Sequence, residues 1–230
     1  MAGLQPRLEL LPAPQRALWR ELHDVKSLGW VLYGGTAIAL RLGHRASVDF
    51  DFFNDKPLDR RRLAEACPGL IRSTVVQERP DTLTVLMSAE AETATVKVSF
   101  FGGLGFGRVG EPDLASDGVV EVASADDLLA HKLKVLLQRV ETKDYLDIAA
   151  LLDSGLHLDR GLASARALFG SAFQPSESLK ALVYFEGGDL HTLPAAVKET
   201  LITAARRVRD LPAAQRISGT LSASGAGRHF

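Results

Sequence analysis

The sequence predicts an α+β protein, in which an N-terminal mixed β-sheet with flanking helices is followed by a C-terminal helical domain. Runs rich in β-branched and aromatic residues recur in the first 123 residues, whereas apolar residues at helical spacing dominate the remainder. A glycine-rich stretch at 102–118 lies just before this change. We therefore expect an α/β domain at 1–123, a helical domain at 124–212 and a flexible tail at 213–230.

The N-terminal elements follow from periodicity and from the positions of glycine and proline. Residues 17–28 repeat apolar side chains at helical spacing, and Gly29 can end that helix. Thr36 begins a compact helix that Gly43 can end, and the charged run at 59–67 predicts a surface helix closed by a Pro-Gly pair. Strands are expected at 30–33, 47–53, 71–77, 82–87, 95–101 and 119–122.

The C-terminal half carries helix-capping signals. Ser124 and Asp127 resemble a capping box that opens a helix at 125–139, and Thr142 can cap the next helix, at 143–152. Three more helices are expected at 158–169, 177–185 and 194–211.

Two adjacent stripes are predicted on the helix at 125–139. One consists of Lys132, Leu136 and Arg139. The other is apolar and consists of Leu129, Leu133, Leu137 and Val140. Such a helix can pack on the first half of the chain while it turns two cations toward a cleft.

Composition excludes several classes of protein. The chain has 230 residues, with 27 Lys+Arg against 28 Asp+Glu, so any contact with nucleic acid must come from a local patch. Its 46% hydrophobic and 24% charged residues are ordinary for a globular protein. The single cysteine, Cys67, cannot form an internal disulfide or a cysteine-rich zinc site. We found no signal segment and no membrane-spanning run, and so expect a cytoplasmic protein with no membrane partner.

The most informative segment joins a glycine pair to an acidic strand. Gly34-Gly35-Thr36 follows a predicted strand and opens a predicted helix, which would present unpaired backbone N–H groups to an anion. Glycine allows close approach of a bulky anion, and Thr36 adds a hydroxyl donor. This arrangement suits a triphosphate, although a glycine pair after a strand is most often only a tight turn.

The acidic strand follows after twelve residues, as Asp49-Phe50-Asp51. Strand alternation places both carboxylates on one face, and Val48, Phe50 and Phe52 on the buried face. Adjacent carboxylates repel each other unless a cation lies between them, and Mg²⁺ binds to one or two carboxylates plus substrate phosphates. The pattern therefore favours phosphoryl or nucleotidyl transfer, against the alternative of a solvated edge strand.

The segment from Tyr33 to Phe53 resembles the nucleotidyltransferases of the AbiEii/AbiGii toxin family, within the DNA polymerase β-like superfamily. The second part of that family's pattern is matched by a helix lysine, Lys132, and by an Arg-x-x-Lys-Asp…Asp signature. The signature residues are Arg139, Lys143, Asp144 and Asp147. The resemblance covers the motif-bearing parts of residues 30 to 152, and the motifs in this order are far more specific than any of them alone.

The resemblance implies a nucleotidyltransferase-like fold and a toxin that moves a nucleoside monophosphate from a nucleoside triphosphate to an acceptor. The acceptor in such relatives can be RNA, including the 3′ end of tRNA, and an antitoxin is the expected protein partner. The implied nucleotide-binding residues are Gly34, Gly35, Thr36, Ser47 and Lys132. The implied ligands of Mg²⁺ (or Mn²⁺) are Asp49 and Asp51.

Two of the implied roles have simpler alternatives. Lys132 would neutralise phosphate charge, or it is only a solvated lysine on a helix. Asp144 would act as a base or as an orienting carboxylate, or it only stabilises the N-terminus of its helix.

One position departs from the family pattern. The superfamily generally has a third carboxylate on a nearby strand, where this chain has Ser99. Serine is a weak ligand for Mg²⁺ and a poor base. Asp144 could take over the role, one metal ion could suffice, the enzyme could be slow, or the site could bind nucleotide without catalysis.

Other motifs have weaker claims. The string at 105–110 matches G-x-G-x-x-G, but Pro112 excludes the helix that a dinucleotide site needs. Two basic clusters, Arg60-Arg61-Arg62 and Arg206-Arg207-x-Arg209, are solvated helix faces or contacts for an RNA backbone. A small molecule such as an aminoglycoside is the alternative acceptor.

Overall fold

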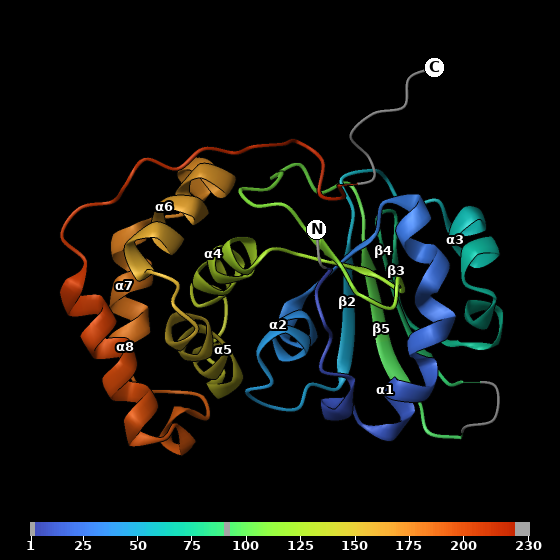
Figure 1. The fold of residues 1–230 in the computed structure, drawn as a ribbon, viewed down its shortest axis with the longest axis horizontal. Helices are drawn as coiled ribbons and strands as arrows, with labels where there is room; N and C mark the ends of the chain where they lie inside the picture. Colours follow the sequence, from blue (N-terminus) through green and yellow to red (C-terminus); the bar gives the residue numbers. More distant parts are fainter. Residues whose placement is uncertain (1–2, 90–92, 224–230) are drawn as a thin grey trace. The chain divides into compact units, whose positions relative to one another are not determined.

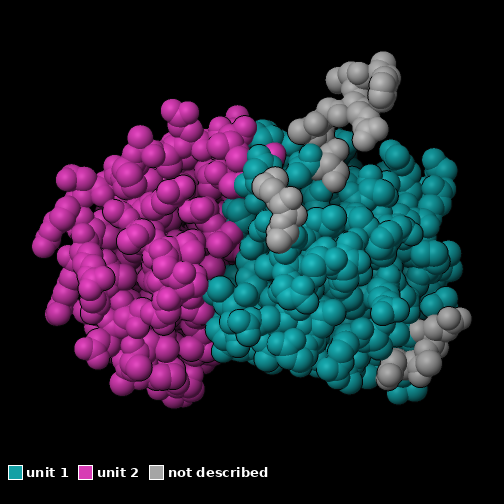
Figure 2. Space-filling view, in the orientation of Figure 1, with its two compact units in different colours: residues 1–107, 111–124, 218–230 teal, residues 108–110, 125–217 magenta. Residues whose placement is uncertain are grey.

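The computed structural model describes residues 3–89 and 93–223, and these form two compact units. Unit 1 comprises residues 1–107, 111–124 and 218–230, and unit 2 comprises residues 108–110 and 125–217 (Figure 2). Unit 1 contains the sheet and unit 2 contains the helices α4 to α8. The α+β class predicted from the sequence is confirmed.

The described part of unit 1 has one seven-stranded sheet, in the order β3-β4-β5-β2-β1-β7-β6. The sheet is mixed, because β2 pairs in parallel with β5 but antiparallel with β1. The remaining pairs are antiparallel, except for the parallel pair of β1 with β7. The strands are β1 (Val31–Tyr33), β2 (Asp49–Phe53), β3 (Thr74–Arg79), β4 (Thr82–Met87), β5 (Val96–Phe101), β6 (Asp113–Leu114) and β7 (Glu121–Val122).

Helices cover both faces of the central strands (Figure 1). One face carries α2 (Gly34–Leu42), and the other carries α1 (Ala13–Leu18), η2 (Trp19–Leu28) and α3 (Arg60–Ala66). Phe50 and Phe52 on β2 are fully buried, and Trp19 packs on Phe50 with 6.0 Å between ring centroids. Two short helices, η1 (Leu8–Leu10) and η3 (Pro68–Arg72), complete the described part of unit 1.

Several boundaries in unit 1 differ from those predicted. The helix expected at 17–28 begins at Ala13, and its second part is the 3-10 helix η2. The prediction that Val48 lies on the buried face of a strand is wrong: β2 begins at Asp49, and Val48 is 62% exposed. The strand expected at 71–77 begins at Thr74, because the Pro-Gly pair starts η3 instead.

Unit 2 is built from helices that pack on one another. The helices are α4 (Ala125–Val135), α5 (Thr142–Asp153), α6 (Leu158–Phe169), α7 (Pro175–Val183) and α8 (Ala195–Arg207), with short helices η4 (Gly170–Ala172) and η5 (Leu190–Thr192). At Gly161 in α6, an added Cβ would lie 2.6 Å from Leu129 of α4, so the missing side chain allows these helices to approach closely. The Ser178 hydroxyl of α7 donates to the Leu133 carbonyl of α4 at 2.9 Å.

The helix predicted at 125–139 ends earlier than expected. Because α4 stops at Val135, the second half of each predicted stripe is not on a helix. Leu137 and Val140 are 37% and 42% exposed, so the prediction of a long apolar stripe is wrong there. Arg139 lies beyond the helix and reaches α5 instead.

Tertiary contacts are made at the first turns of both helices for which caps were predicted. Asp127 accepts hydrogen bonds from the backbone N–H groups of Val109 and Gly110 at 2.8 and 3.1 Å, which anchors the end of the G-x-G-x-x-G string. The N–H of Thr142, the first residue of α5, donates to the carboxylate of Asp189 at 2.6 Å. Asp127 thus binds α4 to the preceding loop, and the acceptor at the start of α5 comes from a residue outside that helix.

The C-terminal segment contributes buried residues to unit 1. The sequence predicts a flexible tail from residue 213, but Leu221 is fully buried and its N–H donates to the carboxylate of Asp55 at 2.9 Å. The N–H of Ala223 likewise donates to the carboxylate of Glu121 at 3.1 Å. The last part of the predicted tail, 224–230, lies outside the described residues.

Candidate active site

The turn between β1 and α2 contains a glycine that packs directly on an acid. Gly34 has a φ of +73°, in the left-handed region that side chains disfavour. A Cβ at this position would lie 2.7 Å from Oδ2 of Asp51. The glycine turn and the acidic strand are therefore in direct contact, with no packed side chain between them.

The next glycine faces a basic group and a hydroxyl group. A Cβ on Gly35 would lie 2.5 Å from Nη2 of Arg45 and 3.2 Å from Oγ of Ser47. The Arg45 guanidinium also donates to the Ala46 carbonyl at 2.9 Å. Arg45 was not among the residues singled out from the sequence, because an arginine in a loop has no periodicity to mark it. Its only sequence signal was its place between the glycine pair and Asp49.

Thr36 has a structural contact that the sequence did not indicate. Its side chain is buried, and its hydroxyl donates to the backbone carbonyl of Asp49 and lies 2.9 Å from the Ser47 hydroxyl. Thr36 thus ties the first turn of α2 to the start of β2. In this structure the hydroxyl is directed toward β2, and its contact with a phosphate remains a prediction.

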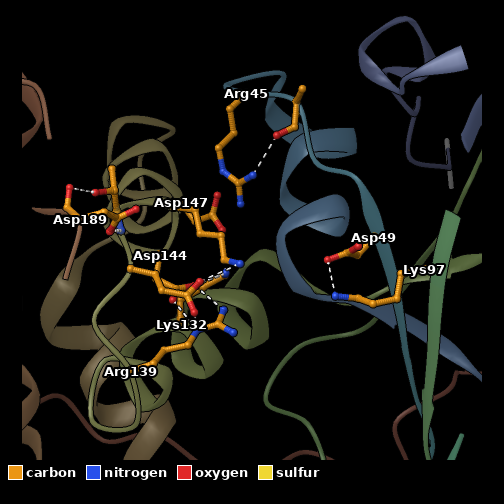
Figure 3. Close-up of polar contacts among 12 residues, drawn as sticks. Arg45, Asp49, Lys97, Lys132, Arg139, Asp144, Asp147 and Asp189 are labelled. Carbon is orange, nitrogen blue, oxygen red and sulfur yellow. Dashed lines mark hydrogen bonds and ion pairs between the residues drawn. The ribbon is translucent and has the colours of Figure 1, made fainter. Parts of the chain in front are cut away.

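The two acids of β2 lie on one face of the strand, opposite the buried Phe50. The side chain of Asp49 is 31% exposed, and its Oδ2 lies 2.8 Å from the Lys97 ammonium (Figure 3). Lys97 is directly opposite Asp49 in the pairing of β2 with β5. The acidic face of β2 therefore has the ammonium of Lys97, on β5, beside its two carboxylates.

Ser99 lies directly opposite Asp51 in the same strand pair. It is 3% exposed, and its hydroxyl lies 3.4 Å from the hydroxyl of Thr84 on β4, which is also buried. Two neutral hydroxyl groups thus occupy the row beside Asp51. The pairing places Ser99 beside the acids, on a strand next to theirs, as expected for the position where the superfamily has a third carboxylate.

The residues of unit 1 fit a divalent cation that also binds phosphate. Among the described residues, no three His, Cys, Asp or Glu side chains are grouped so that they could hold a metal ion by themselves. Asp49 and Asp51 supply two carboxylates, and Mg²⁺ is commonly held by one or two carboxylates plus substrate phosphates. The donor set therefore matches a metal ion that arrives with a nucleotide.

In unit 2, four of the predicted site residues form one ion cluster, which is buried except at Arg139 (Figure 3). The Lys132 ammonium lies 2.7 Å from Oδ1 of Asp144 and 2.7 Å from Oδ2 of Asp147. Arg139 donates to both carboxylate oxygens of Asp144, at 2.8 and 3.0 Å. Both aspartates are fully buried and Lys132 is 6% exposed, so Lys132 is not a solvated helix lysine.

Charge pairing sets the protonation state of this cluster. Burial alone raises the pKa of Asp144, but hydrogen bonds from Arg139 and Lys132 outweigh it, and the pKa is lowered from its usual value. A carboxylate so held is a weak proton acceptor. Lys143 does not join the cluster: its ammonium lies 2.7 Å from the half-exposed Glu141.

A mixed sheet with an Asp-x-Asp strand beside a glycine turn defines a protein of the nucleotidyltransferase fold. MenT4, a nucleotidyltransferase toxin of Mycobacterium tuberculosis H37Rv, has a similar structure, with a TM-score of 0.56 at 14% sequence identity. The similarity covers 86% of this chain and 87% of that one.

The chain belongs to the AbiEii family, described as nucleotidyl transferase toxins of type IV toxin–antitoxin systems, whose sequence model matches residues 16–215. This confirms the family that the motifs indicated. An uncharacterized protein of Aquifex aeolicus (strain VF5) is 32% identical over 137 residues, which cover 57% of this chain and 63% of that relative. In the part of the chain that the structure describes, no helix is both long and apolar enough to cross a bilayer.

Proposed function

We propose that the protein transfers a nucleoside monophosphate from a nucleoside triphosphate to RNA, with the 3′ end of tRNA as the acceptor, in a reaction that depends on Mg²⁺ or Mn²⁺. The contact of Gly34 with the Asp51 carboxylate supports this most directly. It joins an anion-binding turn to a pair of cation-binding acids. Membership of a toxin family further supports a cytoplasmic role as a toxin restrained by an antitoxin.

The proposed reaction is a substitution at the α-phosphorus. A hydroxyl oxygen of the acceptor forms a bond to that phosphorus, while the bond to the bridging oxygen of the β-phosphate breaks. Pyrophosphate leaves with the bonding electron pair, and the hydroxyl proton passes to solvent. A divalent cation on the acid pair would supply charge neutralisation at the phosphates.

Residues of the chain would bind and orient the triphosphate. Backbone N–H groups at Gly34 and Gly35 begin α2 and favour an anion, and the Arg45 guanidinium beside Gly35 adds a positive charge. Asp49 and Asp51 would hold the cation. In this scheme Asp144 is an orienting carboxylate for Lys132, not the base, because its pKa is lowered.

One of the two basic clusters is better suited than the other to contact RNA. Arg60 and Arg61 are 2.9 and 2.8 Å from carboxylates of Glu78 and Glu65, so their charge is already paired. At the end of α8, by contrast, Arg206, Arg207 and Arg209 are exposed and form no ion pair among the described residues. We assign the RNA backbone contact to this cluster.

The test is incubation of the pure protein with total tRNA, Mg²⁺ and each labelled nucleoside triphosphate in turn. Label should appear in tRNA with at least one nucleotide and disappear in Asp49→Asn and Asp51→Asn. Asp24→Asn, an exposed acid of η2, is the matched control and should transfer label like the parent protein. Replacement of the three arginines by Gln should weaken tRNA binding and reduce its salt dependence.

Absence of label transfer with every nucleotide, from a folded protein, would contradict the proposal. If tRNA is not labelled but a small aminoglycoside is, the chemistry holds and the acceptor assignment is wrong.

Ser99 favours a second candidate function, a module that binds a nucleotide or RNA without catalysis. A hydroxyl stands where the superfamily has a carboxylate, and it is buried beside Thr84. Calorimetry that detects triphosphate binding, together with mass spectrometry that finds no modified acceptor from a cellular pool, would support this candidate.

A further inference from the structure

We infer that this site holds a single divalent cation, and that the Lys97 ammonium stands in place of a second one. The inference rests on the proposed function and concerns the same acids. It follows from three features of unit 1: the ion pair of Lys97 with Asp49, the hydroxyl groups beside Asp51, and the charge that remains.

The Lys97 ammonium binds a carboxylate oxygen of Asp49 that a second cation would need as a ligand. It is 2.8 Å from Oδ2 of Asp49, and backbone pairing of β2 with β5 fixes the two residues opposite each other. Strand pairing keeps Lys97 on the face of the acids in every side-chain conformation. The side chain of Lys97 is 44% exposed, so water reaches the ammonium as well as the carboxylate.

The residue beside Asp51 cannot replace the Asp49 carboxylate oxygen that the Lys97 ammonium binds. Ser99, opposite Asp51, is neutral, 3% exposed and 3.4 Å from the hydroxyl of Thr84. A neutral hydroxyl is a weak ligand for Mg²⁺ compared with a carboxylate. The described part of the chain groups no third acid with Asp49 and Asp51 into a metal-binding set.

The remaining charge suits one divalent cation. Two carboxylates and one ammonium leave a net charge of −1, whereas three carboxylates without the lysine would carry −3. One divalent cation on the first set and two on the second give the same net charge, +1, to meet the triphosphate, and a second divalent cation on the first set would lie close to the Lys97 ammonium.

The inference is tested by counting bound Mn²⁺. The protein is mixed with one equivalent of a triphosphate analogue whose α,β-bridge is a methylene group, and electron paramagnetic resonance measures the Mn²⁺ left free in solution. The parent protein should bind one Mn²⁺ per complex. Lys97→Met combined with Ser99→Asp should bind two, and Ser99→Asp alone should remain at one.

Lys56→Met is the matched control, because it removes one exposed lysine from unit 1 without touching the acid pair. It should leave the count at one. Circular dichroism establishes that each variant is folded, and the count for the parent protein stands even if the double variant does not fold.

Two Mn²⁺ ions per complex in the parent protein would overturn the inference. So would a folded double variant that still binds one, because Lys97 and Ser99 would then not limit the site. Failure of the proposed function has a different signature: Asp51→Asn would leave Mn²⁺ binding unchanged, and the parent protein would transfer no label.

Discussion

The Lys132 ammonium and the Asp144 carboxylate form a buried ion pair with 2.7 Å between nitrogen and oxygen. Asp147 and Arg139 complete the cluster: Lys132 joins α4 to α5 through buried side chains, and Arg139, which is 43% exposed, covers Asp144 from the segment after α4. Charges taken out of water in this way are tolerated only while each retains its partner. Loss of one member therefore leaves another charge buried and uncompensated.

We expect Asp144→Ala to lower the free energy of unfolding by about 3–5 kcal/mol, as removal of one partner of a buried pair does. Urea denaturation measures the effect. Asp153→Ala, an exposed acid at the end of the same helix, is the matched control and should change stability by no more than about 0.5 kcal/mol. Equal losses in the two variants would mean that the cluster adds no stability of its own.

The same carboxylate predicts how stability changes in acid. Its pKa in the folded protein is lowered by Arg139 and Lys132, whereas in the unfolded chain the carboxyl group has the ordinary pKa of an aspartate. The stability it contributes is therefore fully present above the unfolded pKa and is lost as the pH falls through the lower folded pKa. Asp144→Asn should flatten the loss of stability below about pH 4. Denaturation curves recorded at several pH values measure this, and an equal loss of stability in Asp144→Asn and in the parent protein at low pH would contradict the prediction.

Local patterns predicted most of the fold and one half of the site. The strands β1, β2, β4 and β5 were found from alternation and residue type, and the glycine turn and the acid pair lie on them. The family pattern placed Ser99 on a strand near the acids, but its pairing with Asp51 depends on the register of β2 with β5, which the sequence did not predict.

Features that depend on partners far away in the sequence were missed. Helical periodicity continued α4 to residue 139, but Arg139 leaves the helix to bind Asp144. The sequence could not show that Lys132 is buried, since burial depends on how α4 and α5 pack. Asp189, which binds the first N–H of α5, is 47 residues from Thr142 and has no local signal.

The thiol of Cys67 should be unreactive in the native protein. The side chain is fully buried, and this burial, with a smaller contribution from the charge of Glu21, raises the pKa of the thiol to about 11. The thiolate is the reactive form, so little of it exists at pH 8. We expect a thiol-reactive disulfide that releases a coloured product to label the folded protein far more slowly than the protein in denaturant. Rapid native labelling would show that α3 opens readily.

The most direct test of the site geometry is substitution at Gly34. Alanine there adopts a disfavoured positive φ and also places a Cβ 2.7 Å from Oδ2 of Asp51. Gly118→Ala is a close control, because Gly118 has a φ of +75° and nothing within 4 Å of an added Cβ. Both variants should lose about 1–2 kcal/mol of stability from backbone strain. Only Gly34→Ala should also move the Asp51 carboxylate, and a displacement of about 1 Å in an active site can lower the rate about a hundredfold.

Label transfer and urea denaturation, measured on both variants, separate the loss of activity from the loss of stability. Equal transfer rates in the two variants would show that the glycine turn does not position Asp51 for the reaction.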